Sequence, residues 1–447
     1  MSQIEKRLIG AAGLVLPTLC LMAAGSAHAQ AAAPALLGHQ AALELDSAGA
    51  SWLGTSTALV LLMTLPGLAL FYGGMVRKKN VIATITQSVG VFAVVSLVWF
   101  IAGYSLAFGA NGNAGLQPFI GSLDMLFLNG VSLQTANALL PGIPEFLFIS
   151  FQMTFAIITP ALVTGAFAER MKYSALLLFT ALWSLLVYAP ICHWVWGGGF
   201  LGSAGVLDFA GGAVVHVNSG VAGLVCAIVL GRRKGYGVEP ILAHNPVLTM
   251  IGASLLLVGW IGFNAGSAGA ANDLMGVALL NTLLAAAAAA LTWKIVEYIE
   301  KKKVSLIGML SGVVAGLVAI TPAAGFVDPK GAVIIGLIAG PVCYASSVWI
   351  KKLLRYDDSL DAFGIHGAGG LIGALLTGVF ASTAINSLSE GANIGAQALG
   401  LLWTIVYSAI GTLIILFVCK FTTGLRVSEA EETAGLDTSL HGEALEP

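Results

Sequence analysis

The chain has 447 residues, of which 57% are hydrophobic and only 9% are charged, and its formal net charge at pH 7 is -2. A soluble domain has about 25% charged residues, so this composition excludes a soluble globule, whose surface would be one large apolar patch. The charge balance also excludes a nucleic-acid binder, because no basic face is available to neutralise phosphates.

The N-terminus is typical of a secretory signal peptide. Lys6 and Arg7 precede an apolar run from Leu8 to Ala24, and residues 27–29 form an A-x-A cleavage site. An uncleaved extra helix is the alternative, although the run is short for a full span. We predict three parts, namely a signal peptide (1–29), a transmembrane domain (30–420) and a cytoplasmic tail (421–447).

Eleven apolar stretches follow the signal peptide, and each could cross about 30 Å of hydrocarbon as a helix. The predicted fold class is therefore an all-α polytopic membrane protein with eleven transmembrane helices. The predicted spans are 52–76, 84–109, 145–167, 174–197, 213–231, 247–266, 274–293, 304–325, 331–350, 363–382 and 395–419.

Basic residues predict the orientation of these spans. The segments that follow the odd-numbered spans contain 17 Lys and Arg residues, whereas the opposite loops contain only Lys330. Since basic loops stay in the cytoplasm, the N-terminus is predicted outside and the C-terminus inside. The signal peptide predicts the same orientation independently.

A sequence pattern recurs after 150 residues and indicates an internal repeat. The pattern D-x7-H-x3-G-x2-G spans Asp208, His216, Gly220 and Gly223, and it returns as Asp358, His366, Gly370 and Gly373. Each copy holds five spans, and an odd number must invert the second copy. Helices 1–5 and 6–10 are thus predicted to form an inverted repeat, an arrangement that places transport sites near the midplane.

Two histidines are the deepest ionisable residues, one on each copy of the repeat. An ionisable group at membrane depth marks a pathway by default, and paired imidazoles can share one proton. We therefore favour a functional pair, His216 and His366, over two unrelated hydrogen bonds to neighbouring helices. Ligation of a haem by both histidines is a weaker alternative.

Other polar and aromatic residues have simpler interpretations beside the functional one. Asp208 is either a buried anion that helps a cation to enter or a helix cap, and capping is also the simple interpretation of Asp358 and Asp361. The aromatic pairs are ordinarily belt or packing residues, but an aromatic cage with a hydroxyl would suit a small desolvated cation. These aromatic pairs are Phe151 and Phe155, Trp194 and Trp196, and Trp260 and Phe263.

Several of these motifs resemble the ammonium transporter (Amt/Rhesus) family, bacterial Amt type. The similar segments include the run from Phe151 to Arg170, the run from Tyr188 to Trp196, the block from Asp208 to Gly223, Trp260 to Ser267, Asp361 to Gly367, and the tail around Gly435 to Glu443. Together they cover nearly the whole mature chain, except that nothing is assigned to the outer loop from Gly109 to Pro144.

The resemblance implies a role for each matching residue. Trp196, Phe155 and Ser267 would form an outer ammonium recruitment site, and Phe155 and Phe263 a stacked gate. His216 and His366 would line the pore, with Trp260 beside them. Asp208 would serve a structural or electrostatic role, and the further candidates are Phe151, Gln152 and Asp361.

The implied function is ammonium transport rather than catalysis, with no cofactor and no metal. Ammonium would lose a proton near the gate and cross as ammonia, a mechanism that excludes potassium because potassium has no proton to lose. The implied setting is a homotrimer in the cytoplasmic membrane of a bacterium. A PII-type signal protein is a candidate partner for the inner face.

Two rival functions remain at this point. An ammonium sensor would signal through the cytoplasmic tail, which is acidic but too short to fold alone. A membrane haem enzyme would use the two histidines as iron ligands and would show a Soret band.

Overall fold

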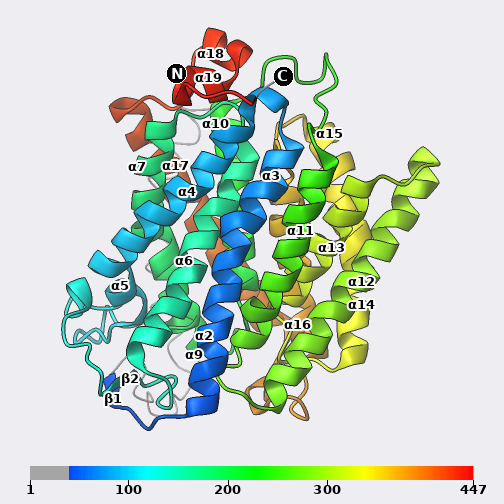
Figure 1. Ribbon diagram of the computed structural model, residues 1–447. Helices are drawn as coiled ribbons and strands as arrows, with labels where there is room; N and C mark the ends of the chain where they lie inside the picture. Colours follow the sequence, from blue (N-terminus) through cyan, green and yellow to red (C-terminus); the bar gives the residue numbers. More distant parts are fainter. Residues whose placement is uncertain (1–39, 446–447) are drawn as a thin grey trace. The chain divides into compact units, whose positions relative to one another are not determined.

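The computed structural model describes residues 40–445, so the predicted signal peptide lies outside the described residues. Most of the described residues are helical, and the long helices lie side by side (Figure 1). Helices are expected here because each one satisfies its own backbone groups where lipid offers no partner. The predicted all-α membrane fold is confirmed.

The first predicted repeat contains five spans, several of them interrupted by π-helical turns. In chain order they are α2 (Ser47–Leu62), η1 (Met63–Leu68) and α3 (Ala69–Met75); η2 (Lys78–Asn80), α4 (Val81–Val98), η3 (Trp99–Gly103) and α5 (Tyr104–Phe108); α6 (Glu145–Phe167); α7 (Tyr173–Trp183), η5 (Ser184–Tyr188), α8 (Ala189–Val195) and α9 (Phe200–Ser203); and η6 (Gly212–Val217) with α10 (Asn218–Leu230).

The second predicted repeat and the remaining segments are also α-helices, some of them interrupted by π-helical turns. They are α11 (Pro246–Trp260) with η7 (Ile261–Ala265); α12 (Asp273–Lys301); α13 (Leu306–Ile320); α14 (Pro329–Tyr344), η8 (Ala345–Ile350) and α15 (Lys351–Leu354); η9 (Phe363–Gly367) with α16 (Ala368–Phe380); α17 (Ile394–Thr422); and the tail helices α18 (Glu429–Ala434) and α19 (Leu436–His441). Two short 3-10 turns, η4 (Leu126–Leu128) and η10 (Ser387–Ser389), lie in loops.

All eleven apolar stretches predicted from the sequence are helical. Within residues 40–445, ten of these helical segments are long and apolar enough to cross a membrane, and the eleventh, α13, has 15 residues. The predicted span 304–325 is thus too long at its C-terminal end. The helix stops at Ile320 because Pro322 follows, and proline cannot continue the backbone hydrogen-bond ladder.

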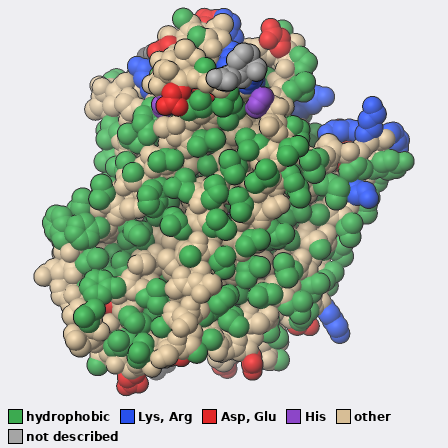
Figure 2. Space-filling model, viewed as in Figure 1, with side chains coloured by type: hydrophobic (Ala, Val, Ile, Leu, Met, Phe, Trp, Pro, Cys, Tyr) green, Lys and Arg blue, Asp and Glu red, His purple; other side chains and the backbone are tan. Residues whose placement is uncertain are grey.

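Large apolar side chains cover the outside of the bundle. Leu97 is 63% exposed and Leu402 is 58% exposed, and hydrophobic atoms dominate the face seen in Figure 2. On this face, the Lys and Arg side chains gather mainly toward the end that carries α18 and α19. This distribution of charge fits the predicted orientation, with the tail in the cytoplasm.

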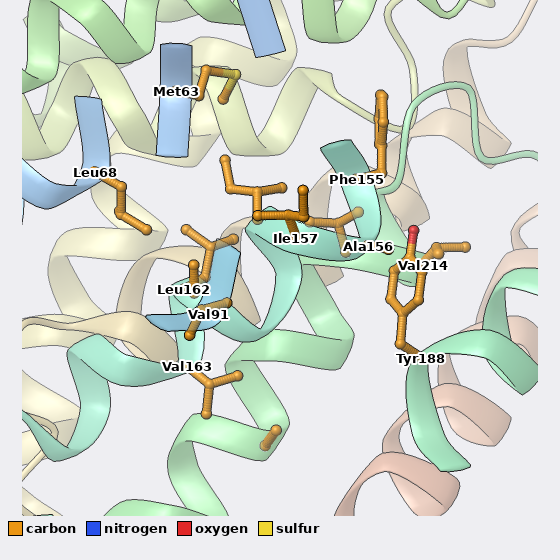
Figure 3. Packing of buried hydrophobic residues seen from close by; sticks show 14 of the residues in the cluster. Met63, Leu68, Val91, Phe155, Ala156, Ile157, Leu162, Val163, Tyr188 and Val214 are labelled. Atoms are coloured by element: carbon orange, nitrogen blue, oxygen red, sulfur yellow. The ribbon is translucent and has the colours of Figure 1, made fainter. Parts of the chain in front are cut away.

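The interior is packed with apolar side chains from different spans. Figure 3 shows Met63 and Leu68 of η1 among the same buried cluster as Ile157 and Leu162 of α6. All four side chains are at most 2% exposed. The first and third spans therefore meet through close contacts of the kind that hold helices together where lipid supplies no hydrophobic drive.

The two copies of the repeated pattern form matching structures. Each consists of a π-helical turn and a 13-residue α-helix, η6 with α10 and η9 with α16. A side chain on Gly220 would meet the backbone of Gly367, and one on Gly370 would meet the carbonyl of Gly212. Gly220 comes late in the first copy and meets Gly367 early in the second, and Gly370 comes late in the second copy and meets Gly212 early in the first. The two helices therefore run in opposite directions where they cross, as an inverted repeat requires.

The outer loop adds a small sheet that the sequence did not predict. Strand β1 (Gln40–Ala42) pairs antiparallel with β2 (Thr135–Asn137), with Gln40 opposite Asn137. Figure 1 places this two-stranded sheet at the opposite end from α18 and α19. The loop 109–144 is therefore anchored to the start of the described chain.

The C-terminal tail is docked onto the segments between spans at the same end of the bundle, including the start of α4. The backbone N–H of Ala83 donates to Asp437 Oδ1 at 2.8 Å, and the N–H of Leu436 donates to Asn80 Oδ1 at 2.8 Å. Glu432 accepts a hydrogen bond of 2.6 Å from the backbone N–H of Lys234. A segment too short to fold alone is thus ordered by the loops that it contacts.

Candidate functional site

The two histidines of the repeat face each other. His216 lies in η6 and His366 in η9, and their Nδ1 atoms are 3.3 Å apart. Both side chains are buried, at 1% and 4% exposed. The close crossing at Gly220 and Gly370 brings the two π-helical turns together, and π-turns are frequent at functional sites. The predicted pairing is therefore present in the structure.

Thr321 completes the hydrogen bonding of this pair, although the sequence analysis did not identify it. Its hydroxyl lies 3.3 Å from His216 Nε2 and accepts a hydrogen bond of 3.0 Å from the indole N–H of Trp260. The same hydroxyl donates its single proton to the carbonyl of Leu317 at 2.8 Å. The sequence did contain a signal for Thr321, because it is a polar residue directly before Pro322 inside an apolar segment.

These contacts favour one tautomer of each neutral imidazole. A threonine hydroxyl has one proton. Assigning this proton to the carbonyl of Leu317, the nearer acceptor at 2.8 Å, makes Nε2 of His216 the donor to Thr321. Nδ1 of His216 is then the acceptor for the Nδ1–H of His366, and Nε2 of His366 has no proton. The pair therefore forms a directed chain of hydrogen bonds.

A narrow cavity beside the histidines is almost entirely apolar. His216, His366 and Trp260 are the lining residues with ring nitrogens. The rest of the lining is made by Met63, Leu68, Phe71, Ile158, Leu162, Val215, Leu256, Phe263 and Val314. Such a wall offers an ion no substitute for its hydration shell, whereas a small neutral molecule loses little on entering it.

Two stacked phenylalanines lie beside the cavity, and Phe263 belongs to its lining. The rings of Phe155 and Phe263 are 4.3 Å apart with an interplanar angle of 29°, and both side chains are at most 1% exposed. The Phe263 ring lies 5.8 Å from the ring of His216. The stacked rings therefore lie next to the histidine pair.

The other candidate residues near this stack contact the ring of Phe155 or the backbone of Phe263. Trp196 is half-buried, and its ring is 6.0 Å from the ring of Phe155 at 87°. Phe151 packs edge-on against Phe155 at 4.9 Å. Ser267 is also half-buried and donates its hydroxyl proton to the carbonyl of Phe263 at 2.8 Å, which leaves its oxygen able to accept an N–H bond.

Asp208 acts as a helix cap in this structure. Both of its carboxylate oxygens accept backbone N–H bonds, and the four donors are residues 211, 212, 213 and 214 at the start of η6. Its backbone carbonyl accepts the indole N–H of Trp196 at 2.8 Å. One residue therefore holds both the segment of His216 and the outer tryptophan, which favours capping over direct contact with a cation.

Asp358 plays the same role in the second copy of the repeat, where it caps the start of η9. Its oxygens accept N–H bonds from Ala362, Phe363 and Gly364. Burial raises the pKa of Asp358 to about 6, and the negative charge of Asp361 adds to this effect. Asp361 itself forms an ion pair with Lys351, so it does not join the aromatic residues.

Gln152 lies next to Phe151 on α6 and is half-buried. Its side-chain oxygen is buried and has no hydrogen-bond partner among the described residues. It is therefore available to a ligand, although no contact connects it with the histidines.

The geometry opposes the haem alternative. Two imidazole nitrogens at hydrogen-bonding distance leave no space between them for an iron and its macrocycle.

The same architecture occurs in known proteins. The family model described as "Ammonium Transporter Family" matches residues 51–445. The ammonium transporter of Aquifex aeolicus is 48% identical over 406 residues, which cover 90% of this chain and 93% of that protein. The crystal structure of Saccharomyces cerevisiae Mep2 superposes with a TM-score of 0.79 at 36% identity, covering 87% of this chain and 89% of that one. A structure titled "Sensor Amt Protein" superposes with a TM-score of 0.80 at 32% identity, covering 88% of this chain and 98% of that one.

Proposed function

This chain belongs to the ammonium transporter family and is not an enzyme, and we propose that it conducts ammonia derived from ammonium through the cavity beside His216 and His366. The observation that supports this proposal most strongly is the imidazole pair, 3.3 Å apart, in an otherwise apolar cavity.

Recruitment is proposed to occur at Trp196, Phe155 and Ser267. A desolvated ammonium ion would gain cation–π attraction from the two rings and one directed hydrogen bond to the serine oxygen. Ammonium would thereby be concentrated next to the stacked rings of Phe155 and Phe263, which act as the gate.

Selectivity is proposed to come from deprotonation. Potassium and ammonium have nearly the same size, so a filter based on size would admit both. An apolar pore rejects any ion that keeps its charge, and only ammonium can lose its charge by releasing a proton. Ammonia would then pass between the rings and reach the imidazole pair.

The histidine pair supplies hydrogen bonds where the cavity wall supplies none. With His216 as the donor to Thr321, the imidazole nitrogen left with a free lone pair is Nε2 of His366. Ammonia can donate an N–H to that lone pair as it moves away from the gate. The released proton either returns outward or follows the imidazole chain.

The test is to measure ammonium flux and electrical current together in proteoliposomes, with potassium as a competitor. We expect flux that potassium does not inhibit, and a large loss of flux or selectivity in His216→Ala and His366→Ala. Properly inserted variants with wild-type rate and selectivity would show that the imidazoles have no such role. A ratio of charge to nitrogen near zero or near one would distinguish net ammonia from net ammonium transport.

We further propose that the protein is a homotrimer in the cytoplasmic membrane of a bacterium, with the N-terminus outside. Exposed apolar side chains on α11 and α12, such as Val258 at 45% and Leu291 at 55%, are compatible with subunit contacts. Native mass spectrometry of the solubilised protein tests the subunit number, and protease access from each side tests the orientation.

Ammonium sensing is a second candidate function, because one similar structure is titled as a sensor Amt. The docked tail, through Asp437 and Glu432, would be the element that responds. A PII-type signal protein is the proposed partner at this face. Pull-down from nitrogen-replete cells with and without residues 421–447 tests it, and equal recovery of a PII protein from both samples would exclude the tail as its binding site.

A further inference from the structure

A buried histidine on α8 contacts two backbone carbonyls. His193 is 0% exposed. Its Nδ1 lies 2.9 Å from the carbonyl oxygen of Ala107, near the end of α5. Its Nε2 lies 2.7 Å from the carbonyl oxygen of Gln117, in the outer loop. Both ring nitrogens of this side chain therefore face a hydrogen-bond acceptor.

A neutral imidazole cannot satisfy both of these contacts. It has one N–H donor and one lone pair, so the lone pair would face either the carbonyl of Ala107 or that of Gln117. A buried acceptor without a donor is destabilising. The imidazolium form has two N–H donors and satisfies both carbonyls.

No carboxylate neutralises this ring, because His193 forms no ion pair within residues 40–445. The outer loop from 109 to 121 has no titratable residue. The other titratable groups on α8, on the elements packed against it and just before η6 are Tyr104, Tyr188, Cys192, Asp208 and His216. Asp208 uses both carboxylate oxygens on backbone N–H groups. Burial disfavours a charged ring, so His193 keeps its second proton only while both carbonyls stay in place.

The backbone beside Trp196 packs directly on these contacts. The N–H of Gly197 donates to the carbonyl of His193 at 3.0 Å. A side chain on Gly197 would clash with the carbonyl oxygen of Ala107, so a glycine is needed for this close approach. Trp196 is thereby held between the contacts of His193 and its own indole bond to the carbonyl of Asp208 at 2.8 Å.

A second bond attaches the outer loop to the same segment. The carbonyl of Pro118, next to Gln117, accepts the backbone N–H of Phe200 at 3.0 Å. This bond involves no titratable group, unlike the contact of His193 with Gln117. Loss of one proton from His193 would therefore loosen the outer loop without detaching it.

We propose that His193 is a doubly protonated positioning residue, whose two bonds clamp the outer loop onto the segment that holds Trp196. Acidic solution favours the second proton, so the clamp tightens as the pH falls and loosens as the pH rises. The consequence for ammonium recruitment rests on the proposed function, whereas the charge of His193 and the order of the outer loop do not.

The test is NMR spectroscopy of the full chain in lipid bilayers, with nitrogen-labelled histidine and tryptophan. We expect both ring nitrogens of His193 to carry a proton at about pH 5.5. The indole N–H of Trp196 should exchange with water more slowly at about pH 5.5 than at about pH 8, after correction for intrinsic exchange. His193→Gln cannot become doubly protonated, so it should abolish this difference and speed the exchange at the lower pH at least about fivefold.

His244→Gln is the matched control, because His244 lies just before α11 and its ring makes no hydrogen bond with the described residues. It should leave the exchange at Trp196 unchanged. A single protonated ring nitrogen on His193 at about pH 5.5 would overturn the proposal, and this measurement needs no variant to fold. Equal exchange in His193→Gln and the wild type would also overturn it.

Transport measurements then connect the clamp with recruitment. His193→Gln should raise the ammonium concentration for half-maximal flux about threefold and change the maximal flux little. An unchanged concentration in His193→Gln, with a raised one in Trp196→Leu, would show that the clamp does not position Trp196. If the exchange results are as expected and neither variant changes this concentration, the recruitment role of Trp196 fails and the clamp stands.

Discussion

His216 Nε2 lies 3.3 Å from the hydroxyl oxygen of Thr321, and this contact connects the histidine pair to a third side chain. With the threonine proton assigned to the carbonyl of Leu317 at 2.8 Å, His216 donates at Nε2 and accepts at Nδ1. The chain of hydrogen bonds then points from His366 through His216 to Thr321. A side chain outside the repeated pattern thus gives direction to a pair that is otherwise nearly symmetric.

Thr321→Val should reduce transport by about tenfold, because it leaves the Trp260 N–H and His216 Nε2 without their buried acceptor, and such losses cost about 1–3 kcal/mol. Nitrogen NMR of labelled histidine should show Nε2–H on His216 in the wild type and a mixture of tautomers in the variant. Thr377→Val is the control, since Thr377 only donates to the carbonyl of Gly373. Equal effects of both substitutions would show that Thr321 has only a structural role.

Trp196→Leu should raise the ammonium concentration for half-maximal flux by about three- to thirtyfold, because one cation–π contact is worth about 0.5–2 kcal/mol. Flux in proteoliposomes over a range of ammonium concentrations measures this. Trp194→Leu is the matched control, since its indole N–H donates to Phe119 at 2.7 Å and its ring packs on Tyr407. A similar change in both variants would assign the effect to packing.

Asp358 should take up a proton near pH 6, because burial and the charge of Asp361 raise its pKa to about 6. The folded pKa is above the ordinary value of about 3.9, so the folded state binds the proton more tightly than the unfolded state. The contribution of Asp358 to the free energy of unfolding therefore falls as the pH rises from about 4 to about 6. Above about pH 6 the full destabilisation by the ionised carboxylate remains.

Infrared difference spectra between pH 5 and pH 7 should show the carbonyl band of a protonated carboxyl group, and Asp358→Asn should abolish the band. Asp328→Asn is the control, because Asp328 caps α14 at the other end of the bundle. A band that persists in Asp358→Asn and disappears in Asp328→Asn would contradict the assignment.

Asp437→Ala should release the tail from the start of α4, since it removes the buried acceptor of the Ala83 N–H. We expect limited proteolysis to cleave the tail at least about fivefold faster, with little change in the melting temperature of the bundle. Glu443→Gln is the control, because Glu443 is exposed and its side chain makes no hydrogen bond or ion pair with the described residues. Unchanged cleavage in Asp437→Ala would show that this contact does not hold the tail.

The sequence by itself determined the class of the molecule and much of its site. Long apolar stretches must become helices in lipid, so the spans could be predicted, and the spacing of Asp208, His216 and Gly220 revealed the repeat. The pattern also identified both histidines, since ionisable residues are rare at membrane depth. The length of α13 was overestimated because hydropathy continues past the proline that ends the helix.

Only the tertiary structure decided what these residues contact. The stacking of Phe155 on Phe263 joins positions 108 apart, and the bond from His216 to Thr321 joins positions 105 apart. No local pattern encodes such contacts, because they depend on how helices cross and where π-helical turns rotate a side chain. Most of the candidate site residues could therefore be predicted from the sequence. The packing of the spans determined their hydrogen-bonding partners and the direction of the hydrogen-bond chain through the histidine pair.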